Sequence, residues 1–333
     1  MKALYITLIF GITFIQNLFA QQEFQMANTP NNHYLFNPAA GGLTDILHLE
    51  LNTRLQWLGY DGGPKTVLLA GNTQIGGDQA IGDFNTEDEL MFKNPKISVS
   101  KSKHVVGGKV WYDGIGPFSK TSLQGTYAYH LPMRKGFMAG VGMGLGWSNF
   151  GLNSNRVVLY QADDANYNQF LGTSSNQNFL DAQTGLVIYN SHFFFGLSAT
   201  QMFKNQFKPG GVETGSNFNT HFFLVTKYRF QNKESDFGFE PTLVIKMAKN
   251  VKNTIDFGAK LWYLQSAWFG MQYRTSNNLV FQAGSNLLKN FYVSYAFELG
   301  VGKIRTANNG THEFQVGYYF GRNRNLKQEI KEK

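Results

Sequence analysis

The side chains best able to do chemistry are dispersed along this sequence rather than gathered into motifs. The seven histidines are His33, His48, His104, His130, His192, His221 and His312. No two of them have the His-x-x-x-His spacing of a metal site, and zinc needs several converging ligands. The chain has no cysteine, which excludes disulfides, thiolate metal sites and lipid attachment at a cysteine. We therefore expect no metal and no cofactor, and we interpret a histidine on the polar face of a strand as a hydrogen-bonding group.

Acidic and glycine-rich stretches also fall short of known binding motifs. Glu87-Asp88-Glu89 and Asp163-Asp164 lack the alternate-residue spacing of a calcium loop, so we interpret them as solvated loop charge. A row of alternate glycines, 140 to 146, lacks the strand-loop-helix context and the Lys-Ser/Thr of a phosphate loop. Two interpretations of that row remain: the glycines let a wall curve, or they let a plug or partner chain approach closely.

No catalytic constellation can be identified. His312 and Glu313 are adjacent in a predicted strand, so their side chains lie on opposite faces and cannot form a dyad. An outer-membrane hydrolase would need a Ser/His or Asp/His arrangement at a rim, and the sequence offers no clear one. We predict a protein without enzymatic activity.

The elements that position these side chains are long alternating strands. Between Ile46 and Trp57 the odd positions are mainly apolar and the even positions polar, a period of two over 12 residues. This is about double the usual strand length of globular proteins and close to what a tilted strand needs to cross a bilayer. A soluble sandwich also alternates, but with strands of about five or six residues.

The same pattern recurs to the end of the chain. It predicts an all-β fold, an antiparallel transmembrane β-barrel of about 14 strands, closed so that no edge faces lipid. Residues 76–94 are predicted to be an inserted loop. Residues 150–178 and 204–217 are predicted to be long outer loops, and the short connections are expected on the periplasmic side.

The sequence divides into four parts. Residues 1–20 have the charge, apolar run and small final residue of a cleaved signal peptide; about 17 apolar residues are short for a membrane anchor. We expect residues 21–42 to be a periplasmic lead-in segment, 43–321 the barrel and 322–333 a charged periplasmic tail.

The distribution of charge argues against a nucleic-acid partner, and the predicted barrel makes outer-membrane lipid the expected one. The chain has 30 Lys and Arg against 22 Asp and Glu, net +8. Apart from the tail, the basic residues are scattered, whereas a nucleic-acid site needs them clustered on a face. A barrel interior should be polar, so charged residues on the polar faces are candidates for a lumen network. These are Glu50, Arg54, Arg229, Lys246 and Lys260.

Several motifs resemble those of the PorP/SprF family of Bacteroidetes outer-membrane proteins. The resemblance rests on Asn37-Pro38-Ala39-Ala40-Gly41, on Arg54-Leu55-Gln56-Trp57-Leu58-Gly59, on Gly63-Pro64-Lys65-Thr66, on Asp113-Gly114-Ile115-Gly116-Pro117 and on Gly310-Thr311-His312-Glu313-Phe314. These stretches span nearly all of the predicted mature chain, and residues 76–103 are longer than the family pattern.

The resemblance implies an outer-membrane barrel associated with type IX secretion and, in some members, gliding motility. Such a barrel would anchor or help to assemble secreted proteins that carry a C-terminal sorting domain. The outer loops would meet the secreted protein, and a periplasmic lipoprotein or peptidoglycan-binding protein would be a further partner. The alternative is a passive diffusion channel, since a barrel of this strand number is wide enough unless something fills it.

Overall fold

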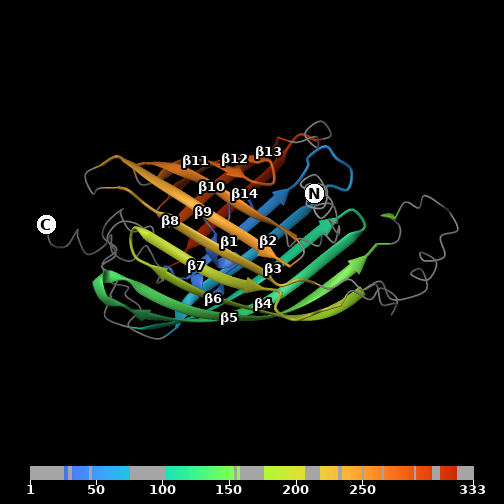
Figure 1. Ribbon diagram of the computed structural model, residues 1–333, viewed down its shortest axis with the longest axis horizontal. Coiled ribbons are helices and arrows are strands. Elements are labelled where there is room, and N and C mark those ends of the chain that lie inside the picture. The colour runs from blue at the N-terminus through green and yellow to red at the C-terminus, as the bar shows by residue number, and fades with distance from the viewer. Residues whose placement is uncertain are drawn as a thin grey trace, which may run out of the picture.

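The chain folds into a closed barrel of fourteen antiparallel strands (Figure 1). The computed structural model describes residues 26–28, 32–44, 47–75, 102–153, 156–157, 176–206, 218–231, 235–249, 251–264, 266–288, 290–301 and 308–320. The strands are β1 (His48–Leu55), β2 (Lys65–Ile75), β3 (Lys103–Ile115), β4 (Phe118–Pro132), β5 (Met138–Leu152), β6 (Asn176–Tyr189), β7 (Phe193–Thr200), β8 (His221–Tyr228), β9 (Phe237–Ala248), β10 (Val251–Tyr263), β11 (Ala267–Arg274), β12 (Asn278–Leu288), β13 (Phe291–Gly300) and β14 (Thr311–Tyr319). The predicted fold class and strand number are confirmed.

Closure comes from the pairing of the first and last strands. His48 lies opposite Tyr319 and Leu55 opposite His312, while every other strand pairs with its neighbours in sequence. The sheet therefore has no open edge, as a bilayer requires. No helix in the described part of the chain is long and apolar enough to span a membrane.

The alternation of side chains between the two faces follows the sequence pattern. On β5, Val141, Met143 and Leu145 are exposed on the outer face while Gly142 is buried on the inner face. The outer face is thus apolar and suited to lipid, and the inner face is mostly polar.

Two predicted boundaries differ from the structure, and other predictions fall outside the described residues. β1 begins at His48 rather than at residue 43, because Leu43 still packs against buried residues inside the barrel. β5 continues to Leu152, so the long break after it is shorter than predicted. The predicted signal peptide, most of the 76–94 loop and of the two outer loops, and the charged tail lie outside the described residues.

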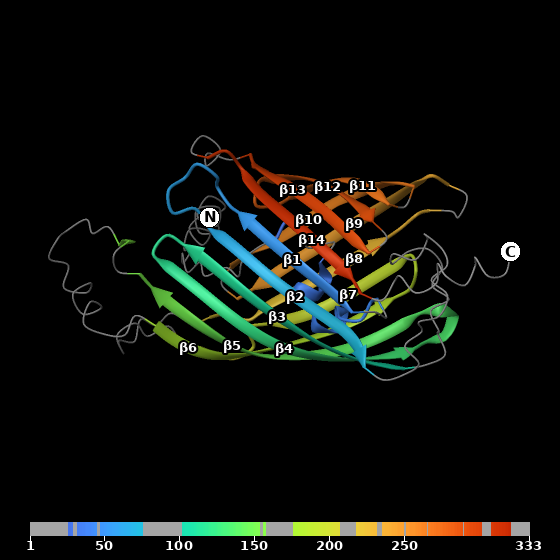
Figure 2. The same ribbon diagram turned by 180° about the vertical axis from the view of Figure 1, so that it is seen from behind.

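Residues 26–28 and 32–42, here called the interior segment, lie inside the barrel and are buried throughout. Figure 2 shows the blue turns of this segment within the ring of strands. It forms two short 3-10 turns, η2 (His33–Leu35) and η3 (Pro38–Ala40). The Asn32 side chain accepts a hydrogen bond from the Leu35 N–H, and the Asn37 side chain accepts one from the Ala39 N–H, so each turn is capped by the asparagine before it.

The interior segment runs along the barrel from one end to the other. Odd-numbered strands begin at one end, here the first end, and finish at the other, the second end. Ala27 contacts Glu313, the third residue of β14, which starts at the second end. Gly42 contacts Lys103, the first residue of β3, at the first end, and β1 begins soon afterwards.

Candidate functional site in the barrel interior

At the second end, side chains of the wall bind backbone groups of the interior segment. The Glu313 carboxylate accepts hydrogen bonds from the N–H groups of Ala27 at 2.7 Å and Asn28 at 2.9 Å. The Gln282 side-chain amide donates to the Ala27 carbonyl oxygen at 2.7 Å. Because Glu313 is fully buried, these charge-assisted bonds form away from water and are stronger for it.

Two lysines bind the segment further along. Lys109 Nζ donates to the carbonyl oxygens of Leu35 at 2.8 Å and Tyr34 at 3.1 Å. Lys103 Nζ donates to the Gly42 carbonyl oxygen at 2.6 Å. A buried ammonium needs several acceptors, and here the turns of the segment supply them.

Glycines in the wall make room for the closest approach of the segment. A Cβ added to Gly142 would lie 2.7 Å from the Pro38 carbonyl carbon and would collide with Ala39. A Cβ on Gly185 would collide with the Asn37 side chain. The other three glycines of the row, 140, 144 and 146, face wall residues instead. Of the two interpretations of the glycine row, close approach of a plug applies to Gly142.

Asn37 connects the segment to two strands at this contact. Its side-chain amide donates to the carbonyl oxygens of Leu186 and Leu197, each at 3.1 Å. The same side chain caps η3, so one residue fixes both the local turn and its docking position.

Ion pairs cross the interior in two groups. The second-end group joins Arg54 to Glu298 and Glu313, Arg274 to Glu298 and Asp256, and Lys246 to Asp256. The first-end group joins Arg229 and Lys260 through Glu240. All of these side chains are at most 9% exposed, so removing one partner would leave the other charge buried and unpaired.

The five candidate lumen residues therefore lie in three places. Arg54 and Lys246 belong to the second-end group, and Arg229 and Lys260 to the first-end group. Glu50 accepts hydrogen bonds from Gln315 at 3.2 Å and Tyr292 at 3.3 Å. The carboxylates within the two ion-pair groups, Glu240, Asp256, Glu298 and Glu313, were not among the lumen candidates, although all lie at inward positions of alternating strands.

The motif residues fall into three structural groups. Asn37, Pro38, Ala39 and Gly41 belong to the interior segment, and Arg54 and Glu313 bind each other on adjoining strands. The remaining motif residues lie in connections at the second end, except His312, which lies on β14: Gln56, Trp57, Gly63, Pro64, Gly116 and Pro117. Gln56 N–H bonds to Pro64 O, Trp57 N–H to Thr311 Oγ1, and His312 Nδ1 lies 2.7 Å from the Tyr295 hydroxyl.

Lys103, Lys109 and Gln282 were missed by sequence reasoning. Each is a polar residue on the inner face of a strand. A search of the inward positions for lysine and glutamine would therefore have found all three. Their partners are backbone carbonyl groups of a segment without periodicity, which no sequence pattern indicates.

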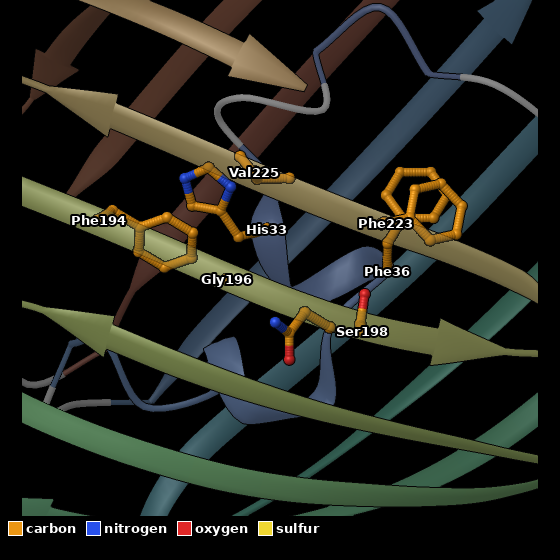
Figure 3. Close-up of a pocket in the computed structure, with 8 residues that line it drawn as sticks. His33, Phe36, Phe194, Gly196, Ser198, Phe223 and Val225 are labelled. Carbon is orange, nitrogen blue, oxygen red and sulfur yellow. The ribbon is translucent and has the colours of Figure 1, made fainter. Parts of the chain in front are cut away.

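A small cavity lies where the interior segment meets β7 and β8 (Figure 3). It is lined by His33, Phe36, Asn37, Phe194, Gly196, Ser198, Phe223 and Val225. The His33 ring stacks on Phe194 with centroids 4.0 Å apart, and Phe36 stacks on Phe223 at 4.7 Å. Neither ring nitrogen of His33 has a hydrogen-bond partner among the described residues.

Burial sets the ionisation of the two aromatic residues of η2. Desolvation, reinforced by Lys227 and Lys260, holds the pKa of His33 well below its usual value, so this imidazole is neutral. Desolvation also raises the pKa of Tyr34, whose hydroxyl lies 2.6 Å from Thr126 Oγ1. Within the described residues no three His, Asp or Glu side chains are grouped to hold a metal ion.

Solved structures similar to this chain are barrels of outer-membrane proteins. The CymD monoaromatic hydrocarbon channel has a TM-score of 0.50 at 11% identity, covering 86% of this chain and 92% of that one. The Ralstonia pickettii toluene transporter TbuX gives 0.48 at 11% identity, covering 85% and 91%. The Acinetobacter baumannii outer membrane protein Omp33 gives 0.46 at 10% identity, covering 84% and 100%.

No curated protein matches the sequence. The model of one family does, over residues 18–318, nearly the whole chain, and its description is type IX secretion system membrane protein PorP/SprF. The match spans the interior segment and the fourteen strands except the last residue of β14, and the fold is the lipid-facing barrel that such a membrane protein needs. The chain is therefore an outer-membrane β-barrel that belongs to the PorP/SprF family of type IX secretion system membrane proteins.

Proposed function

We propose that this barrel is a closed component of type IX secretion that anchors or helps to assemble secreted proteins carrying a C-terminal sorting domain. Family membership supports the association with secretion. The observation that favours an anchor over a channel is the interior segment, which is bonded to the wall at both ends of the barrel. A filled interior suits a protein that works through its rims.

Partners would then bind at the two ends. We propose that the second end, which carries the connections at 154–175 and 207–217, faces outward and meets the secreted protein. The first end would meet a periplasmic lipoprotein or peptidoglycan-binding protein. A role in gliding motility would follow if the anchored protein takes part in movement of the cell.

The test is a mild-detergent pull-down of the tagged protein from its native outer membrane, followed by mass spectrometry. We expect a stoichiometric secreted protein with a sorting domain, or a peptidoglycan-binding protein. A second preparation replaces residues 154–175 by a short turn, which leaves β5 and β6 intact. It should lose the secreted protein and keep the periplasmic one, whereas unchanged retention of the secreted protein would reject the outer-loop site.

The second candidate is a passive channel, favoured by the polar inner wall. Asn52, Gln272 and Gln282 are fully or almost fully buried there, as in a barrel built to hold water. A barrel that purifies without any partner and conducts ions in planar bilayers in its native state would support this candidate instead.

A further inference from the structure

We infer that the interior segment is a displaceable plug and that the barrel around it is a latent aqueous pore. The inference concerns the barrel interior alone and does not depend on which partners the rims bind. Three features carry it: the kind of bonds that hold the segment, the lining that it covers, and the independence of the wall.

Four wall side chains hold the segment by hydrogen bonds to its backbone, beside the apolar contacts that Leu35, Phe36 and Ala39 make with the wall. Glu313, Lys103, Lys109 and Gln282 all bind N–H or carbonyl groups of the segment. Water can satisfy the same wall groups once the segment leaves, because a hydrogen bond to protein replaces one to water. When the segment leaves, each of these wall groups would therefore exchange its hydrogen bond to the segment for one to water.

Much of the inner wall is polar and suited to water, while Leu68, Phe194 and Phe223 form apolar patches where the segment packs. Inward residues with 9% exposure or less include Asn52, Asn72, Gln124, Thr126, Gln183, Ser198, Gln272, Ser294 and Gln315. Some have no partner in the closed state: both side-chain polar atoms of Asn52 and of Gln272 are buried without a hydrogen bond among the described residues. An inner wall of this composition would be hydrated, not collapsed, if the plug were absent.

The wall does not need the plug to stay closed. β1 pairs with β14 through eight residue pairs, from His48–Tyr319 to Leu55–His312. Arg54 binds Glu298, Arg274 binds Asp256, and Arg229 binds Glu240, so these ion pairs join one strand to another without the segment. The barrel is expected to remain folded with its plug displaced.

The glycine contacts give a way to exclude the plug without altering the wall. The three atoms nearest to a Cβ on Gly142 all belong to Pro38 and Ala39, so a side chain there meets the plug first. Gly125, on β4, has no atom within 4 Å of its Cβ position and lies on the outer face. The pair Gly142→Val and Gly125→Val therefore compares the same substitution at a plug contact and away from it.

The experiment measures conductance in planar phosphatidylcholine bilayers, with heat-modifiable gel migration to show that each barrel is folded. A minor open state has a population of about 0.1–10%, so Gly142→Val is expected to raise the open time about tenfold or more while Gly125→Val matches the wild type. A folded Gly142→Val barrel as silent as the wild type would overturn the inference. If that variant does not fold, a variant that lacks residues 26–40 is measured instead. It should conduct more than the wild type, and a folded but silent barrel would overturn the inference.

A disulfide between the segment and the wall tests the same inference by preventing displacement of the segment. The Asn37 side chain would touch a Cβ at Gly185, which selects Asn37→Cys and Gly185→Cys as the pair to bridge. The native chain has no cysteine, so no other disulfide competes. In urea below the unfolding range of the barrel, the reduced pair should open and the oxidised pair should stay closed. Identical silence in both states would contradict a displaceable plug.

Discussion

The Glu313 carboxylate accepts a hydrogen bond from the Ala27 N–H at 2.7 Å, between residues 286 positions apart in sequence. The same carboxylate binds Arg54 at 3.2 Å. One buried side chain thus joins the interior segment to the strand pair that closes the barrel. The segment therefore docks at the seam between β1 and β14.

Replacing Glu313 by glutamine should loosen the second-end part of the segment. Glutamine keeps the size but loses the charge, and its amide group would face the donors of Ala27, Asn28 and Arg54. The loss of one partner of a buried ion pair costs about 3–5 kcal/mol. Hydrogen exchange followed by mass spectrometry should show the Ala27 and Asn28 amides exchanging at least about 100-fold faster, at about 1.4 kcal/mol per factor of ten.

The control for this prediction is Glu240→Gln. Glu240 is also fully buried and binds Arg229 and Lys260, but in the first-end group. The Glu240→Gln substitution should destabilise the barrel without selectively accelerating hydrogen exchange of the Ala27 and Asn28 amides. Equal exchange of these two amides in both variants would show that Glu313 is not the specific attachment point.

Lys109→Met should weaken docking of η2. Methionine keeps much of the apolar stem but leaves the Tyr34 and Leu35 carbonyl oxygens without the ammonium donor. Hydrogen bonds to charged groups contribute about 1.5–3 kcal/mol each. We expect earlier protease cleavage within the interior segment on a urea titration. Lys65→Met, at an exposed lysine that begins β2, should leave the cleavage profile unchanged, and an identical shift in both variants would refute the assignment.

Acid should release the segment through His33. Burial lowers the pKa of His33, so the docked state favours the neutral ring. Its contribution to docking is complete above the ordinary histidine value of about 6.5 and falls as the pH drops below it, because the undocked ring binds the proton more tightly. The charged groups acting on the ring are Lys227 of β8 and Lys260 of β10, both of which oppose a third positive charge.

The measurement is protease sensitivity of the interior segment between pH 7.5 and 4.5. The wild type should become more sensitive toward acid, and His33→Phe, which can still stack on Phe194, should lose most of this dependence. His192→Phe, at a partly buried turn position between β6 and β7, should keep it. A His33→Phe profile that still follows the wild type would assign the acid effect to other groups.

Much of the wall could be predicted from sequence because its rule is local. Leu51, Met143 and Leu145 face outward and Gly142 inward because side chains alternate along a strand. The position of the interior segment could not be predicted in this way. Its turns are only three residues long, too short for a periodicity, and each is fixed by an asparagine cap and by contacts with distant strands.

The same reasoning explains which parts of the site were found. Arg54 was identified as a lumen residue from its polar position, but its partners Glu298 and Glu313 lie 244 and 259 positions away and meet it only through barrel closure. Lys109 occupies an equally clear inward position, but its acceptors are backbone carbonyl groups. Every residue has such a group, so the sequence does not indicate which of them Lys109 binds.

A charge on the outer face should show how deep each residue lies in the membrane. Leu145 is 64% exposed at the middle of β5, whereas Leu58 is 44% exposed in the connection between β1 and β2. Arginine at the bilayer midplane costs about 2–4 kcal/mol and near the interface about 0–1 kcal/mol. Leu145→Arg should therefore lower the unfolding free energy measured by urea titration in lipid vesicles, and Leu58→Arg should change it little. Equal costs at both positions would mean that the middle of β5 does not lie in the hydrocarbon region.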